Sequence, residues 1–321
     1  MINATPIPGK SMTETLVQVE NLSRYYQNNC AISHLSFSLK AGEVLGFLGP
    51  NGAGKSTTMQ VISGNLAPSE GEVTIAGHDI LEAPRAAKKN LGYLPEHPPV
   101  YRDASVDEYL KYCARLHRIP GNRASTAVEK VKQQCGLQEV GNRLIGNLSK
   151  GYQQRVGIAQ AIVHDPPVVI LDEPTVGLDP IQIREIRQLI RSLGSERSVI
   201  LSTHILSEVQ ATCDRVQIIR AGELIYNATI ESLNQGHEHS IRIALRKNIA
   251  PEQLSTIDGV DHVDVLDPGR FRLFIAPDSN PDALVTTSVQ QDWGLYELIP
   301  EQQSLEDLFI ELTHNDETAA K

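Results

Sequence analysis

Residues 44–57 read VLGFLGPNGAGKST, an apolar run that passes into a glycine-rich segment. The run at 44–48 predicts a buried strand, and a helical pattern begins at Lys55 and stops at Gly64. Between them, residues 49–56 match G-x-x-x-x-G-K-[ST] in full. A glycine-rich turn can match this pattern by chance, but the order strand, loop, helix is the context that identifies a phosphate-binding loop. The sequence therefore predicts an α/β fold of the P-loop NTPase class.

Each part of this loop has an expected role in holding a nucleoside triphosphate. Glycines allow backbone N–H groups to turn inward around the phosphates, and the N-terminus of the following helix adds its dipole. We expect Lys55 to bridge the β- and γ-phosphates and the Ser56 hydroxyl to ligate Mg²⁺. The predicted nucleotide-binding residues of the loop are Gly49, Asn51, Gly52, Ala53, Gly54, Lys55, Ser56 and Thr57.

A second apolar strand, residues 168–171, runs into two carboxylates, Asp172 and Glu173. The carboxyl ends of parallel strands share one edge of a sheet, so these side chains are expected beside the phosphate loop. Asp172 is predicted to hold Mg²⁺, directly or through water, and Glu173 to orient and deprotonate an attacking water. Alone, a strand that ends in Asp-Glu usually marks a solvated strand end; together with the phosphate loop, the functional interpretation is the better one.

A third segment, LSKGYQQR at residues 148–155, resembles the LSGGQ signature of the ATP-binding cassette (ABC) family. The chain departs from the signature at Lys150 and Tyr152. Three residues are kept: Ser149, Gly151 and Gln153. The resemblance covers about residues 14–230. It implies a cassette fold, that is, a RecA-like core with an antiparallel β subdomain and a helical subdomain, which binds ATP and Mg²⁺.

The same resemblance implies a head-to-tail homodimer, because in the family this serine and glycine bind the γ-phosphate held by the opposite subunit. Ser149, Gly151 and Gln153 are therefore expected to complete the partner's ATP site. The physics is compatible, since Ser149 would cap a helix whose N-terminal N–H groups face an anion. Taken alone, the segment is better interpreted as an ordinary N-capped helix, but at this position, just before Asp172 and Glu173, the signature interpretation is the better one.

Smaller motifs follow in the family's order, and their roles are those that the resemblance implies. Tyr26 matches the aromatic that stacks on adenine, with Tyr25 as the alternative and a core tyrosine as the plainer interpretation. Glu96 stands in the loop between core and helical subdomain, near Mg²⁺ and the γ-phosphate, where most cassettes have Gln. Asp179 matches a loop that crosses the dimer interface, and His204 matches a histidine that contacts the γ-phosphate. The expected catalytic residues are Glu173, His204 and Lys55.

The form LSKGYQQR is similar to that of the ATPases that drive ABC-2-type exporters, and residues 304–313 resemble the ending of ABC-2 and gliding-motility-type ATPases. This implies an ATP-hydrolysing subunit that works with integral membrane permease subunits on the cytoplasmic face of the cell membrane. The alternative is a soluble cassette protein that acts on the ribosome or DNA. The chain has a single cassette and no coiled-coil or zinc insertion, which favours transport. A cassette that binds ATP without hydrolysing it is disfavoured by the intact catalytic residues.

Composition favours the same class. Lys plus Arg is 29 and Asp plus Glu is 39, so the net charge is −10 and nucleic acid is not an expected partner. The four cysteines form no CxxC pair, which argues against a zinc site or a disulfide framework and for a reducing compartment. No apolar stretch approaches the roughly 20 residues of a membrane helix. Any role at a membrane therefore needs a partner.

The chain is expected to divide into three parts. Residues 1–13 are predicted as a flexible extension, and residues 14–234 as the cassette, with a helical subdomain at about 97–164. Residues 240–321 are predicted as an accessory α+β domain whose strands and helices follow the ferredoxin-like order β-α-β-β-α-β. A last helix is expected at 304–312, where four apolar residues share one face. They are Leu305, Leu308, Phe309 and Leu312.

Overall fold

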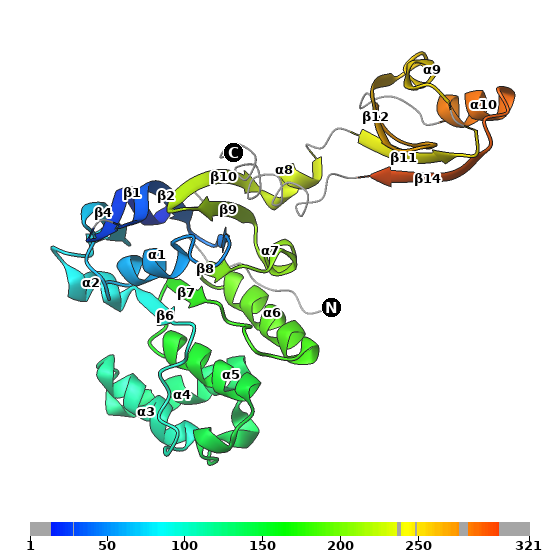
Figure 1. Cartoon of the computed structure of the whole chain (residues 1–321). Helices are drawn as coiled ribbons and strands as arrows, with labels where there is room; N and C mark the ends of the chain where they lie inside the picture. Colours follow the sequence, from blue (N-terminus) through cyan, green and yellow to red (C-terminus); the bar gives the residue numbers. More distant parts are fainter. Residues whose placement is uncertain (1–13, 28, 236–238, 248, 276–281, 302–321) are drawn as a thin grey trace. The chain divides into compact units, whose positions relative to one another are not determined.

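The computed structural model describes residues 14–27, 29–235, 239–247, 249–275 and 282–301. They form two compact units, one that ends at Ile230 and one that begins at Glu231, and each is described by itself (Figure 1). The predicted N-terminal extension and the predicted last helix, with its stripe of Leu305, Leu308, Phe309 and Leu312, lie outside the described residues. None of the helices within these ranges has the length and apolarity that crossing a membrane requires.

A six-stranded, mainly parallel sheet forms the centre of the first unit, in the order β10-β9-β3-β8-β7-β6. Only β10 is antiparallel to its neighbour, β9. All residues of β3, β7 and β8 are buried, as expected for parallel strands covered on both faces. The strands are β3 (Val44–Leu48), β6 (Leu91–Leu94), β7 (Val168–Asp172), β8 (Ser198–Thr203), β9 (Arg215–Arg220) and β10 (Glu223–Thr229).

Three of the helices that pack on this sheet directly follow β3, β7 and β8 along the chain. They are α1 (Lys55–Ile62), α6 (Pro180–Gly194) and α7 (Leu206–Thr212). Met59 and Ile62 of α1 belong to one core cluster with Ile170 of β7 and with apolar residues of the antiparallel sheet described below. Helices α6 and α7 contact each other and β8. A helix-flanked parallel sheet confirms the predicted α/β class, and β3 has the bounds that the apolar run predicts.

A second sheet of the first unit, antiparallel and in the order β2-β1-β4-β5, shares the core cluster with α1. Val17 and Val19 of β1 are fully buried on either side of the less buried Gln18, and Leu16 is buried as well. The short helix α2 (Pro84–Lys89) follows and has proline at its first position, where the missing N–H costs nothing. The strands are β1 (Thr15–Tyr26), β2 (Asn29–Lys40), β4 (Glu70–Ile75) and β5 (His78–Asp79).

Three helices follow β6 and form a helical part of the first unit: α3 (Val106–Leu116), α4 (Gly121–Cys135) and α5 (Lys150–Ile162). Two short 3-10 turns join α4 to α5. A capping box starts α3, because the Glu108 N–H donates to Ser105 Oγ at 3.3 Å and the Ser105 N–H donates to Glu108 Oε2 at 2.9 Å. Ser149 caps α5, where its Oγ accepts the Tyr152 N–H at 3.4 Å.

Where it is described, the second unit contains a four-stranded antiparallel sheet in the order β12-β13-β11-β14, together with the helices α9 and α10. Its core contains Ile241, Ile243, Phe271, Leu273 and Trp293. The ferredoxin-like assignment and the domain boundaries remain predictions. Helix α8 (Ile230–Gln235) precedes the sheet, and the elements that follow it are β11 (His239–Leu245), α9 (Pro251–Leu254), β12 (Val260–Asp267), β13 (Arg270–Ile275), α10 (Asp282–Gln290) and β14 (Leu295–Glu301).

Candidate functional site

The loop between β3 and α1 is packed closely against its neighbours. A Cβ on Gly49 would lie 2.4 Å from the Ile219 carbonyl oxygen, and a Cβ on Gly54 2.6 Å from the Ala31 carbonyl oxygen. Gly54 also has φ +105°, a backbone conformation that other residues rarely adopt. The turn after β9 supports the loop from outside, because the Gly222 N–H donates to the Ala53 carbonyl at 2.9 Å. The shape of the loop therefore depends on glycine at these positions.

Lys55 is the buried cation of the loop, with 5% of its surface exposed. Its Nζ donates to the carbonyl oxygens of Gly49 at 2.8 Å and Pro50 at 3.2 Å. It also lies 3.5 Å from Glu173 Oε1, and both side chains are buried. A buried charge is costly unless it is paired, so the carboxylate of Glu173 offsets the charge of Lys55 in this state.

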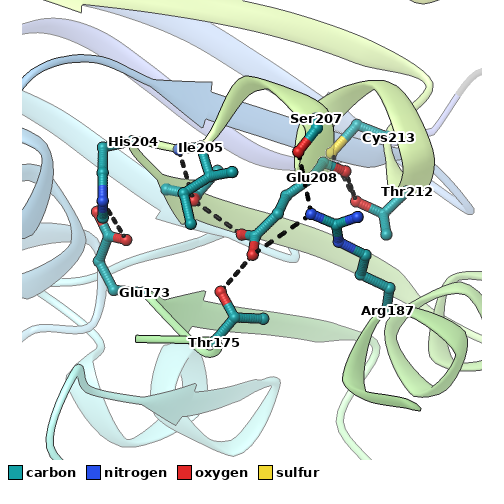
Figure 2. Close-up of polar contacts among 10 residues, drawn as sticks. Glu173, Thr175, Arg187, His204, Ile205, Ser207, Glu208, Thr212 and Cys213 are labelled. Carbon is teal, nitrogen blue, oxygen red and sulfur yellow. Dashed lines mark hydrogen bonds and ion pairs between the residues drawn. The ribbon is translucent and has the colours of Figure 1, made fainter. Parts of the chain in front are cut away.

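Glu173 follows directly after β7 and is held in an unusual backbone conformation, φ +48°. Left-handed backbone in a residue other than glycine has to be held by surrounding contacts, and the Glu173 N–H donates to the Ser202 carbonyl at 2.8 Å. The other carboxylate oxygen, Oε2, lies 2.8 Å from Nδ1 of His204 (Figure 2). One carboxylate is thus placed between a lysine and a histidine, where it can accept a proton from a bound water.

Asp172 is buried at the end of β7, and its Oδ1 has no hydrogen-bond partner among the described residues. Burial raises the pKa of Asp172; the hydroxyls of Ser202 and Ser56 act in the opposite direction, and the nearby charges of Glu173 and Glu96 act in the same direction. A buried oxygen without a partner fits a bound cation or a water that such a cation holds. In the described part of the chain no three His, Cys, Asp or Glu side chains gather as a metal site. A Mg²⁺ at Asp172 would therefore also need hydroxyl, water or phosphate oxygens.

A cavity of about 620 Å³ opens at the phosphate loop. It collects the predicted residues Asn51, Gly52, Gly54, Lys55, Ser56, Thr57, Glu96, Glu173 and His204. Another part of its wall carries no motif in the sequence and is formed by Asn29, Cys30, Ala31, Val176 and Ala221. Nine predicted residues from separate segments thus share one hollow, although their individual roles remain predictions.

Tyr26 lies on β1, with 45% of its surface exposed. The guanidinium of Arg24 lies over its ring, 5.0 Å from the ring centroid. Tyr25 is also exposed, and its N–H donates to Ser69 Oγ at 3.1 Å. Neither tyrosine is among the described residues that line the cavity. Stacking of adenine on Tyr26 therefore remains a prediction.

The signature residues lie apart from this cavity, on α5 and the segment before it. Gln153 Nε2 donates to the carbonyl oxygens of Leu148 at 3.0 Å and Ile145 at 3.2 Å and so holds the turn before the helix. A Cβ on Gly151 would lie 2.8 Å from the side chain of Gln182, so α5 and α6 meet there. Asp179 caps α6 by accepting the Gln182 N–H at 2.9 Å. Within one chain these residues support helix ends, and their role in a second subunit's site remains a prediction.

A family model and curated relatives that resemble this chain all describe ABC transporter proteins. The family model described as ABC transporter matches residues 32–176. The chain is 34% identical to an ABC transporter ATP-binding protein of Bacillus subtilis, YhcH, over 94% of this chain and 96% of that protein. It is 32% identical to the bacitracin transport ATP-binding protein BcrA of Bacillus licheniformis, over 93% of this chain and 97% of that protein.

Solved structures give the same result for the larger part of the chain. An ATP-binding subunit of an ABC transporter has 28% identity and a TM-score of 0.62, and covers 69% of this chain and 93% of its own. The cbiO1 protein of Clostridium perfringens, part of the ABC transporter complex cbiONQ, has 29% identity and a TM-score of 0.63. That match covers 68% of this chain and 90% of the other.

Proposed function

Because the chain belongs to the family of ABC transporter ATP-binding proteins, we propose that it binds ATP with Mg²⁺, hydrolyses it, and drives membrane permease subunits. The similarities to these relatives and solved structures confirm the family and the cassette fold that the sequence predicts. ABC ATPases as a family hydrolyse ATP, and their ATP-binding subunits work with membrane permease components. The observation that carries the proposal is the position of Glu173 between Lys55 and His204 at the phosphate loop.

Binding of ATP would begin with a change of partner at Lys55. In the structure its Nζ is shared between two loop carbonyls and Glu173. The β- and γ-phosphates carry more negative charge than the carboxylate, so Lys55 would turn to them when they enter the loop. Glu173 then loses its cation and becomes free to accept a hydrogen bond from water. Substrate binding thereby prepares the base.

Hydrolysis would then need only one proton acceptor. The oxygen of the water bonds to the γ-phosphorus, Glu173 takes the proton, and the bond from the γ-phosphorus to the bridging oxygen breaks to release ADP and phosphate. The 2.8 Å contact with His204 would hold the carboxylate in place during this step. Ser56 and Asp172 would hold Mg²⁺, with Glu96 nearby, and the ion would supply positive charge to the phosphates.

Two copies of the chain are proposed to act together. In a head-to-tail homodimer, Ser149, Gly151, Gln153 and Asp179 of one subunit would face the ATP bound by the other. That use is compatible with the position of the signature segment outside the cavity of its own chain. Residues 14–234 would form the cassette, and residues 240–321 an accessory domain.

The membrane partner is proposed to be an integral permease of the ABC-2 exporter type, with the ATPase on the inner face of the cell membrane. The signature form LSKGYQQR supports this subgroup. A 32% identical relative is a bacitracin transport protein. Copurification from detergent-solubilised membranes, followed by identification of the bound integral protein, tests this part of the proposal.

Phosphate release from Mg-ATP by the purified chain, measured against ATP concentration, tests the catalytic part. Lys55→Ala is expected to lose both ATP binding and turnover, because the loop loses its fixed charge. Glu173→Gln is expected to keep ATP binding and to lose turnover by about 10²–10⁴-fold, the usual contribution of a general base. The control is Glu43→Gln, which removes a partly buried carboxylate that stands directly before β3 and pairs with Arg215 of β9. Near-normal hydrolysis by Glu173→Gln would exclude Glu173 as the base.

A further inference from the structure

A second carboxylate, Glu208 of α7, is buried behind the catalytic pair with 1% of its surface exposed. Its Oε1 accepts a hydrogen bond from Thr175 Oγ1, and its Oε2 accepts one from Thr203 Oγ1 at 2.9 Å. Figure 2 shows Glu208 directed toward Thr175, on the far side of Ile205 from the pair of His204 and Glu173. Both threonines are buried as well. The sequence predicts no role for Glu208, Thr175 or Thr203.

The two hydroxyls belong to the two segments that carry the catalytic pair. Thr175 lies two positions after Glu173, and Thr203 lies directly before His204. One carboxylate therefore connects the segment of the proposed base to the segment of the histidine that contacts it. Since Glu173 has a left-handed backbone, its position depends on such contacts rather than on local preference.

A third connection runs to α6. Arg187 Nη2 donates to Ser207 Oγ at 3.1 Å and lies 3.9 Å from Glu208 Oε1 (Figure 2). Helix α6 begins directly after Asp179, at the end of the loop that starts with Glu173. The carboxylate of Glu208 thus ties together the base segment, the histidine segment and the helix that follows the base segment.

We infer that Glu208 is a positioning residue for ATP hydrolysis, which fixes Glu173 and His204 relative to each other; this inference rests on the proposed function. A carboxylate accepts hydrogen bonds on two oxygens at once, and here each oxygen takes one threonine hydroxyl. Glutamine has the same size but only one oxygen, so one hydroxyl would face an N–H₂ group and lose its acceptor. Glu208 does not line the ATP cavity, and its effect is on geometry alone.

The first test is Glu208→Gln. A displacement of the base by a fraction of an ångström is expected to lower kcat about tenfold, because misplacement by 1 Å can cost about 10²-fold. The KM and Kd for ATP are expected to stay within about twofold of wild type, because no phosphate-loop contact changes. Glu43→Gln is the matched control, since it removes a carboxylate of a partly buried pair remote from the site and is expected to leave kcat unchanged.

A double variant separates positioning from general destabilisation. Thr175→Val removes one hydroxyl without changing the side-chain volume, and alone it is expected to lower kcat about tenfold by the same route. If both residues act through one contact, Glu208→Gln with Thr175→Val lowers kcat about tenfold, whereas independent effects would multiply to about a hundredfold. Multiplying effects would overturn the inference, as would a normal kcat in either single variant.

Two further outcomes are separable. If wild type hydrolyses ATP and Glu173→Gln does not, the proposed function stands, and a normal Glu208→Gln refutes only the inference. If wild type itself fails to hydrolyse ATP, the proposed function fails first. Should Glu208→Gln not fold, Thr175→Val alone decides, because it leaves the carboxylate and its contact with Thr203 in place.

Discussion

Glu173→Gln is expected to tighten ATP binding as well as to stop turnover, and the structure allows the size of this effect to be worked out. In the structure, Lys55 Nζ lies 3.5 Å from Glu173 Oε1, with both groups buried. At an effective dielectric constant near 20, two unit charges at that distance attract by roughly 5 kcal/mol. Wild-type protein has to give up part of this attraction when Lys55 turns to the phosphates. The variant has no such attraction to lose.

Only part of the attraction can reach the measured affinity. Lys55 keeps its two loop carbonyls, and the amide oxygen of the substituted side chain can still accept a hydrogen bond. Removal of the carboxylate also removes its repulsion of the γ-phosphate, which acts in the same direction. We expect a net gain of about 1.4 kcal/mol, which corresponds to a tenfold lower Kd for ATP. ADP lacks the γ-phosphate and is expected to gain less.

Isothermal titration of the nucleotide-free protein with ATP and with ADP, in excess Mg²⁺, measures both affinities. Glu43→Gln provides the control, because its carboxylate contacts Arg215 and no residue of the cavity. Thermal unfolding with and without ATP gives an independent value, since a ligand that binds only the folded state raises its stability. A folded Glu173→Gln protein with unchanged or weaker ATP affinity would refute the exchange of partners at Lys55.

Three other predictions address the proposed metal ligand Asp172, the proposed homodimer and the proposed accessory domain. Burial raises the pKa of Asp172, so in the metal-free protein the stability of the fold falls as pH rises from the usual aspartate range through this raised pKa. Asp172→Asn should therefore raise the Tm at pH 7 and abolish Mg²⁺-dependent hydrolysis, and an unchanged or lower Tm would contradict this. If Ser149 completes a partner's site, the rate of hydrolysis should rise more steeply than linearly with protein concentration, and a strictly linear rise across the dimerisation range would count against a shared site. Mixing Lys55→Ala chains with Ser149→Arg chains should also restore ATP-dependent dimers, measured by light scattering. Deletion of residues 240–321 should leave ATP binding intact while it changes dimer lifetime or partner-stimulated turnover, and a folded cassette that no longer binds ATP would show that the division into domains is wrong.

The parts of the fold that depend on neighbouring residues in the sequence were predictable. The bounds of β3 follow from its apolar run, and the start of α3 follows from the capping box of Ser105 and Glu108. The same holds for the phosphate loop, because the spacing of its glycines predicts which backbone positions would approach a ligand. Each of these features can be recognised from a short stretch of sequence.

Features built from distant segments were not predictable in this way. The wall of the cavity at the phosphate loop that is formed by Asn29 to Ala31 carries no motif, because it results from β2 passing over that loop. Glu208 looked like one more carboxylate on a short helix, yet it is buried and bonded to threonines 33 and 5 positions away. The signature residues pose a different difficulty, since their proposed ligand is held by a second copy of the chain.

Two hairpin turns in the first unit have the same dipeptide, Ala76-Gly77 and Ala221-Gly222, with positive φ at all four residues. Gly77 has no atom within 4 Å of the position of a Cβ, whereas at Gly222 the Ala31 carbonyl oxygen would be 2.9 Å away. Gly222 is also hydrogen-bonded to Ala53 on one side and Ser33 on the other. For protein engineering the two turns are therefore opposites. We expect a fluorescent reporter or an affinity peptide to be tolerated at Ala76-Gly77, whereas the same insertion at Ala221-Gly222 is expected to displace the loop between β3 and α1.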